Sequence, residues 1–163
     1  MAISTETIRD WAWADGHLGE ITRCLRSVAG EILNIHQATD KQDLYEATDY
    51  VVVIGGGGLV AVRVRDANKP WRDFTIRASR PSGVITELEK LRTGYGRWYL
   101  YAWARGGVFE EWLLVDLDVL RSSGLLDRPE RRRNRDGTQF LPLDIPAITT
   151  AGALIHYERG YDG

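Results

Sequence analysis

The chain has 163 residues, of which 44% are hydrophobic and 27% charged, with one cysteine (Cys24) and a formal net charge of −2. This length and composition predict one soluble globular domain over residues 1–163, and a single cysteine excludes an intrachain disulfide and a cysteine-rich zinc site. With no membrane-length apolar run and no signal-like N-terminus, we expect a cytoplasmic protein that makes no membrane contact.

Charge is unevenly distributed along the chain. Residues 1–59 carry 4 Lys and Arg against 9 Asp and Glu, residues 60–105 carry 10 against 4, and residues 106–163 carry 7 against 10. A basic middle segment between acidic flanks is typical of a localised site for a polyanion. The alternative is that these arginines pair with the flanking acids inside the domain, and charge alone leaves both readings open.

The N-terminal third is predicted to be helical up to residue 32, with a bend at Asp15-Gly16. Its second part carries an apolar stripe that packs on the rest of the protein, made by Leu18, Ile21, Leu25, Val28 and Ile32. Glu20 and Glu31 project to nearly the same side, about 100° from that stripe. Their carboxylates face either the margin of a sheet or solvent. Residues 34–47 are predicted to be a polar loop or a short turn of helix.

Three strands are predicted next. An unbroken apolar run follows Asp49 at residues 50–54 and predicts a central strand buried on both faces. After the four glycines, residues 59–65 alternate and place Arg63 and Arg65 on one face. Residues 73–77 alternate in the same way and end at Arg77. We expect these strands to form one sheet on which the acid and the three arginines converge. If an odd number of residues connects the first two strands, Asp49 pairs with Arg63 or Arg65, and otherwise it faces Val64.

A helix after Ser82 and a hairpin follow. The helix buries Val84, Leu88 and Leu91, and the hairpin joins residues 97–104 and 108–115 through Arg105-Gly106-Gly107. Three aromatic residues of the hairpin share one face, namely Tyr99, Tyr101 and Trp103. We expect them to form a cross-strand core cluster, with stacking on exposed bases as the alternative.

The C-terminal part is predicted to contain a short helix at 116–126, a charged loop, an extended segment at 140–146 and a closing helix at 147–159. Five candidate phosphate ligands lie in the turns of the chain, Arg80 before Pro81 and, in the charged loop, Arg131, Arg132, Arg133 and Arg135. The alternative for the loop is an ordinary solvated turn.

The order helix, three strands, helix, strand, strand over residues 5–115 resembles the αβββαβ core of the PD-(D/E)XK nuclease-like superfamily. The resemblance implies an α/β (α+β) restriction-endonuclease-like fold, with a mixed central sheet flanked by helices and residues 116–163 as an extension. Asp49 matches the first acid of the family motif, and Glu20 or Glu31 matches its helical glutamate.

The chain departs from the family at the E-x-K pair. It has Ala61-Val62-Arg63 or Arg63-Val64-Arg65 there, so the second carboxylate is missing and arginine stands where the family has lysine. Arginine does not act as a base but holds phosphate well. Glu87 and Lys90 on the second helix are candidates for a displaced acid and lysine.

The resemblance implies a nucleic-acid-binding protein of phage or mobile-element origin that binds DNA, or RNA, and cuts DNA with Mg²⁺ or Mn²⁺. Asp49, Glu20 and Glu31 are then the candidate metal ligands. Asp49 and Glu20 act in catalysis with Arg63 and Arg65, and Arg77 joins the two arginines in holding phosphate. The alternatives are a non-catalytic descendant of the fold, or a module that binds a protein partner and whose arginines are structural. Three arginines beside one aspartate favour an anion over a metal ion.

Overall fold

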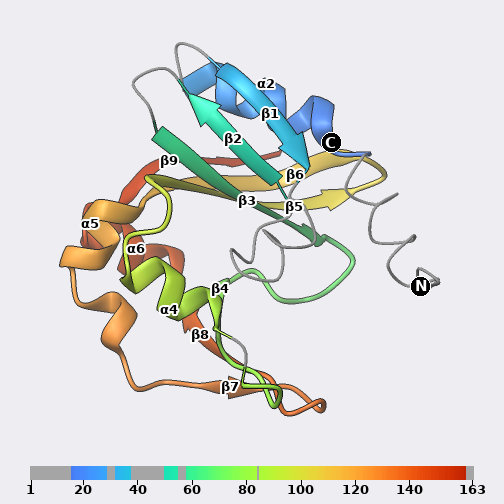
Figure 1. Cartoon of the computed structure of the whole chain (residues 1–163). Helices are drawn as coiled ribbons and strands as arrows, with labels where there is room; N and C mark the ends of the chain where they lie inside the picture. Colours follow the sequence, from blue (N-terminus) through green and yellow to red (C-terminus); the bar gives the residue numbers. More distant parts are fainter. Residues whose placement is uncertain (1–15, 29–31, 38–49, 55–57, 84, 161–163) are drawn as a thin grey trace, which may run out of the picture.

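The computed structural model describes residues 16–28, 32–37, 50–54, 58–83 and 85–160. Its described strands form two sheets, a larger one in the order β1-β2-β3-β5-β6-β9 and a smaller one in the order β4-β8-β7 (Figure 1). In the larger sheet, β3 and β5 are parallel and every other neighbouring pair is antiparallel. The predicted mixed α/β architecture, with a sheet of mixed orientation flanked by helices, is confirmed.

The strands of the larger sheet are β1 (Ile32–Gln37), β2 (Tyr50–Ile54), β3 (Gly58–Asp66), β5 (Trp98–Arg105), β6 (Val108–Asp116) and β9 (Leu154–Arg159). Those of the smaller sheet are β4 (Phe74–Ser79), β7 (Arg132–Arg133) and β8 (Gln139–Leu143). The described helices are α2 (Leu18–Val28), α4 (Glu87–Arg92), α5 (Leu117–Ser122), α6 (Ile145–Thr150) and the 3-10 helix η1 (Leu125–Asp127). No helix in this part of the chain is long and apolar enough to cross a membrane.

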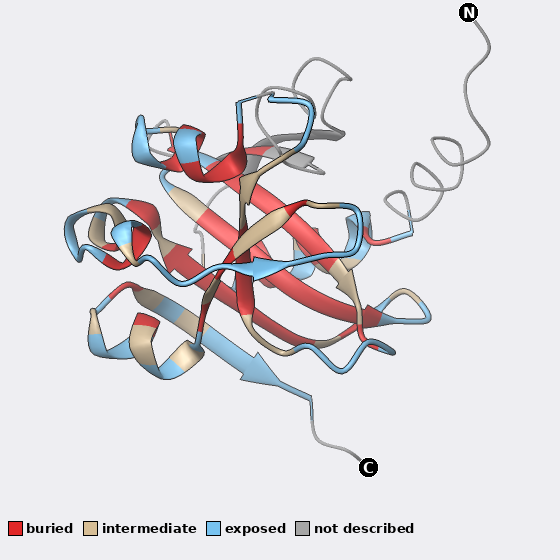
Figure 2. Ribbon diagram, turned by 90° about the horizontal axis from the view of Figure 1, so that it is seen from below, coloured by how far each residue is buried: buried red, intermediate tan, exposed pale blue. Residues whose placement is uncertain are grey.

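The larger sheet has a hydrophobic core on each of its faces, because successive side chains of a strand point to opposite sides. On one face, α2 packs Ile21 and Leu25 against valines of β3. On the other face, α4, α5 and the smaller sheet cover the aromatic residues of β5. Figure 2 shows the middle strands of the larger sheet buried and β9 exposed at its edge. Any side chain of β3 or β5 therefore belongs to one of two separate layers.

The hairpin and the aromatic cluster of β5 agree with their predictions. Gly106 and Gly107 connect β5 to β6 with φ angles of 57° and 83°, which glycine adopts without strain. Three aromatic side chains, those of Tyr99, Tyr101 and Trp103, are each 1% exposed and belong to one core cluster. They are therefore not available to stack on a base.

Two predictions about the strands are wrong. Part of the segment predicted to be a polar loop is β1, which pairs with β2 along its length. The strand predicted at 73–77 exists as β4, but it pairs with β8 in the smaller sheet and does not extend the sheet of β2 and β3. Alternation identifies a strand and its apolar side, but it does not identify the partner strand.

Helix boundaries also differ from those predicted. The first long helix ends at Val28, since β1 begins at Ile32. The second begins after Thr86 instead of Ser82, because Thr86 and Glu89 form a reciprocal capping box. The closing helix predicted at 147–159 is wrong, since Gly152 (φ 75°) follows α6 and the chain continues as β9.

The register between β2 and β3 is the one that an odd-length connection produces. Ile54 pairs with Gly58, which leaves residues 55–57 between them, and Tyr50 pairs with Val62. A connection with an odd number of residues is the case for which the sequence predicts that Asp49 pairs with Arg63 or Arg65. Asp49 itself lies outside the described residues.

Candidate functional site

A buried carboxylate, Glu87, lies where β3, α4 and β5 meet. It stands in the first turn of α4, just after the capping residue Thr86. Its Oε2 accepts a hydrogen bond from the backbone N–H of Arg77 at 2.9 Å and lies 3.1 Å from the Arg63 Nη1. The Tyr99 hydroxyl donates to its Oε1. The Glu87 and Arg63 side chains are 2% and 9% exposed, so this ion pair is almost completely removed from water.

The electrostatics of this cluster follow from burial. Burial raises the pKa of Glu87, and the nearby charges of Arg63, Arg65 and Lys90 together with the Tyr99 hydrogen bond oppose that rise. Burial and the adjacent carboxylate also raise the pKa of Tyr99, so its hydroxyl stays protonated and donates a hydrogen bond to Glu87. The cluster holds α4 and β4 against the larger sheet.

The predicted role of Arg63 in holding a phosphoryl group does not fit this geometry. Its guanidinium is buried and ion-paired with a carboxylate, which makes it part of the interior. Arg65, two positions further along β3, is half-buried and contributes charge to the same region. The Arg77 side chain lies elsewhere, since its Cζ is 6.0 Å from the centre of the Phe140 ring on the smaller sheet. The three arginines therefore do not converge on one face.

Glu20 lies on the opposite side of the larger sheet. Its carboxylate accepts from Arg23 at 3.1 Å and from the backbone N–H of Phe109 at 3.2 Å, and the Arg23 hydrogen bond lowers the pKa of Glu20. Its helix, α2, packs on the face away from Glu87. The structure thus does not bring Glu20 together with Arg63 or Arg65, because the sheet separates them.

The other predicted metal ligands, Asp49 and Glu31, lie outside the described residues. Within the described part of the chain, no group of three His, Cys, Asp or Glu side chains is placed to hold a metal ion. The donor set of Mg²⁺ calls for several oxygen ligands around one point. Glu20, engaged with Arg23 and a backbone amide, does not by itself fit that requirement.

The outer face of the smaller sheet carries a half-buried arginine, Arg77, and an exposed one, Arg132. Phe140 of β8 pairs with Arg77 of β4 on one side and with Arg132 of β7 on the other. Directly opposed residues of antiparallel strands lie on the same face of a sheet, so two arginines flank one aromatic ring. The alternate residues of these strands, such as Ile76 and Leu141, are buried in the core.

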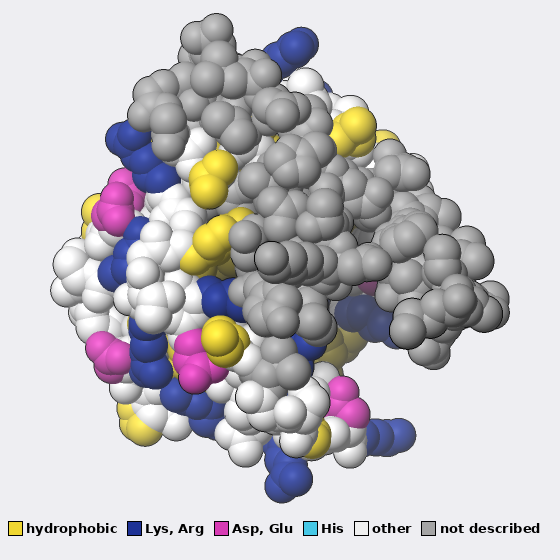
Figure 3. All heavy atoms as spheres, viewed as in Figure 1, with side chains coloured by type: hydrophobic (Ala, Val, Ile, Leu, Met, Phe, Trp, Pro, Cys, Tyr) yellow, Lys and Arg dark blue, Asp and Glu magenta, His cyan; other side chains and the backbone are white. Residues whose placement is uncertain are grey.

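Further arginines surround this row. Arg131 and Arg133 are exposed, and Arg80 is half-buried at the turn after β4. Residues 73–80 and 130–136 together contain six arginines and three acidic residues. Figure 3 shows Lys and Arg side chains, with Asp and Glu side chains among them, at the lower end of the face it presents. We call Arg77, Arg80, Arg131, Arg132, Arg133 and Phe140 together the arginine face; within it Arg133, which pairs with Gln139, projects from the side of β7 opposite to Arg132.

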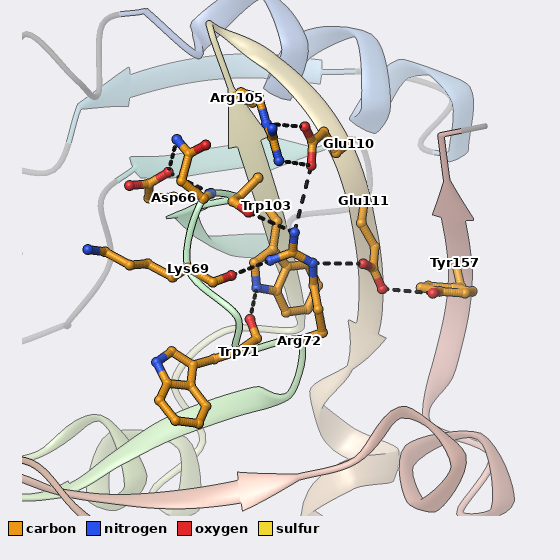
Figure 4. A network of polar contacts seen from close by, with 11 residues as sticks. Asp66, Lys69, Trp71, Arg72, Trp103, Arg105, Glu110, Glu111 and Tyr157 are labelled. Atoms are coloured by element: carbon orange, nitrogen blue, oxygen red, sulfur yellow. Dashed lines mark hydrogen bonds and ion pairs between the residues drawn. The ribbon is translucent and has the colours of Figure 1, made fainter. Parts of the chain in front are cut away.

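A polar network anchors the connection between β3 and β4 to β6 (Figure 4). Arg72 lies 3.5 Å from Glu111 and 3.7 Å from Glu110, and it donates to the carbonyls of Lys69 and Ala67. Glu111 is buried and also accepts from the Tyr157 hydroxyl at 2.7 Å. This network fixes the backbone beside Trp71.

Two aromatic residues at or beside the arginine face, Trp71 and Phe140, were not identified as site residues from the sequence. Trp71 is 56% exposed, and the Cζ of Arg132 lies 5.5 Å from the centre of its ring. The signal available in the sequence is the segment Pro70-Trp71-Arg72-Asp73, in which an aromatic residue follows a proline in an otherwise polar connection. Alternation does not identify it, because it lies outside both strands.

A pocket of about 310 Å³ lies at the other end of the larger sheet, between the start of β3 and α5. Arg121 lines it, but its guanidinium donates to the carbonyls of Leu91, Tyr95 and Gly96 and to the Asp118 carboxylate. These bonds hold the loop after α4 in place. The pocket contains none of the residues predicted to bind phosphate.

Neither a scan against known protein-family models nor a comparison with curated proteins finds a match to this chain.

Proposed function

We propose that this protein binds nucleic acid through the arginine face. The observation that carries the proposal is the row formed by Arg77, Phe140 and Arg132 across three adjacent strands. Guanidinium groups bind phosphate with two hydrogen bonds, and aromatic rings between them are suited to contact sugars and bases. The net charge of the whole chain is −2, so such attraction is confined to this surface and to its neighbouring turns.

The arrangement of the larger sheet supports the family resemblance. Three antiparallel strands, β1 to β3, follow α2, and the chain then reaches β5, parallel to β3, by way of α4. This is an αβββαβ order, in which β4 is inserted ahead of the second helix. A restriction-endonuclease-like fold is therefore part of the proposal, although the strands differ from those matched in the sequence.

The direct test is binding of a fluorescent oligonucleotide, measured by anisotropy over a range of salt concentrations. Each phosphate neutralised by an arginine releases counterions, so affinity should fall steeply between about 50 and 200 mM salt. Replacing Arg131 and Arg133 together with alanine should weaken binding and lower the salt slope by about two. Both side chains are exposed, so the core and the 2.6 Å ion pair of Arg132 with Asp73 stay in place.

A matched control removes two arginines from other surfaces. Arg26 of α2 and Arg97, just before β5, are both exposed; α2 lies on the other face of the larger sheet, and Arg97 lines the pocket beside α5. The double alanine variant at these positions changes the net charge by the same amount and should bind like the wild type. Equal losses in both double variants would show only non-specific attraction, and no binding at low salt would refute the proposal.

We do not extend the proposal to hydrolysis, because the described carboxylates do not form a magnesium site. Cleavage has its own assay, in which single-stranded, duplex and branched DNA are incubated with Mg²⁺ or Mn²⁺ and either the wild type or Asp49→Asn. Metal-dependent cleavage that this substitution abolishes would establish a nuclease. An uncut substrate that is still bound would agree with a non-catalytic binding protein.

A further inference from the structure

Trp71 is a large apolar side chain that the fold holds at the surface. Its own carbonyl accepts a hydrogen bond at 2.9 Å from the indole Nε1 of Trp103, which is 1% exposed. The next residue, Arg72, is tied to β6 through Glu110 and Glu111. The backbone at Trp71 is thus attached to two strands of the larger sheet, while the residue as a whole stays 56% exposed. Figure 4 shows the Trp71 indole turned away from the network that anchors it.

The ring lies next to the arginine face. The Arg132 guanidinium lies over it at 5.5 Å and also forms the ion pair with Asp73. A guanidinium over an indole is a cation–π contact, and it orients the ring and the cation together. One partly exposed aromatic ring, Phe140, pairs across the strands with the same arginine. Aromatic and basic side chains therefore alternate in space, in the order Trp71, Arg132, Phe140 and Arg77.

We propose that Trp71 stacks on an unpaired base of single-stranded nucleic acid whose phosphates are held by the arginine face. This inference rests on the proposed function and specifies the class of strand it binds. A base offers its flat face only where it is not stacked within a duplex, so a fixed exposed indole selects single strands. A duplex meets the same arginines through its phosphates alone.

The positive charge beside Trp71 indicates which kind of partner binds there. An exposed indole by itself suits many partners, but the arginines beside it call for an anionic chain. A strand of nucleic acid supplies a regularly spaced anion and a flat base in each repeat, which matches the alternation of guanidinium and ring. An acidic peptide supplies the charge without the flat base.

The test compares oligothymidylate of about 16 nucleotides with the same strand annealed to oligodeoxyadenylate, by anisotropy at low salt. The wild type should bind the single strand more tightly than the duplex. Trp71→Ala should weaken single-strand binding about 5- to 150-fold and leave duplex binding unchanged, since one stacked base is lost. Trp71→Phe should retain most of the single-strand affinity.

Two controls separate this inference from the proposed function. Leu18 is 38% exposed on α2, which lies on the other face of the larger sheet, and Leu18→Ala should bind both ligands like the wild type.

If the Arg131 and Arg133 double variant loses binding while Trp71→Ala binds single strands normally, the stacking role is wrong and the proposed function stands. If no oligonucleotide binds, both are wrong. If poly-glutamate displaces the single strand as effectively as unlabelled oligothymidylate, the occupant is an acidic protein and the stacking role is overturned.

Discussion

Replacing Arg63 with methionine should destabilise the protein by leaving the Glu87 carboxylate without its buried cation. Glu87 is 2% exposed and then keeps the Arg77 N–H and the Tyr99 hydroxyl as donors. Removing one partner of a buried ion pair costs about 3 to 5 kcal/mol, because the remaining charge stays desolvated. Set against a total stability of about 5 to 15 kcal/mol for a domain, this is a large loss.

A second substitution, at Glu87, should rescue the Arg63→Met variant. In the variant with both Arg63→Met and Glu87→Gln, the neutral amide still offers an oxygen to the Arg77 N–H and carries no buried charge. The double variant should therefore be more stable than Arg63→Met alone. A matched control is Arg65→Met, which removes a half-buried arginine two positions along the same strand and should cost much less.

The pH dependence of the single variant follows from the pKa of Glu87. Burial raises that pKa and Arg63 opposes the rise, so removing Arg63 raises it further. A carboxyl whose pKa is higher in the folded than in the unfolded state destabilises the fold when it is ionised. The loss should be absent below the unfolded pKa of about 4.3 and grow as pH rises above it. The double variant should lack this dependence.

Urea unfolding followed by tryptophan fluorescence measures each of these free energies. A cost below about 1 kcal/mol for Arg63→Met at neutral pH would refute the role of a buried ion pair, since a solvated pair contributes no more than that. That role is also refuted if Glu87→Gln adds to the loss instead of relieving it.

Three further predictions concern other parts of the fold. Burial lowers the pKa of His17 in the folded protein, so stability should fall as pH decreases below about 6.5, the pKa of histidine in the unfolded chain. Below that pH the melting temperature of the wild type should change relative to that of His17→Gln. Burial raises the pKa of Cys24 to about 12, so its thiol should react with a disulfide reagent at pH 8 only after unfolding; rapid labelling of the native protein would contradict its place in the core. Thr86→Ala removes the capping box of α4 and should cost about 1 kcal/mol in thermal unfolding, whereas Ser82→Ala should have little effect.

Local patterns in the sequence were enough to identify several elements. The alternation at 59–65 corresponds to β3, and the predicted hairpin of residues 97–104 and 108–115 corresponds to β5 and β6, with two glycines at the turn between them. The aromatic residues of β5 were predicted to be core, since rings on one face of a strand pack together. The exposed arginines after residue 130 also follow from the sequence, because a run of charge that dense is rarely buried.

The tertiary structure alone decided which charged residues share a site. Sequence alternation placed Arg63 on the polar side of β3, but α4 and the smaller sheet cover that side, so Arg63 is buried with Glu87. The sheet itself separates Glu20 from both. Trp71 lies beside Arg132 although 61 positions separate them in the chain, because β4 and β7 are brought together by β8. A periodic pattern reports which side of an element is apolar, whereas the contacts of its polar side depend on segments distant in the sequence that pack against it.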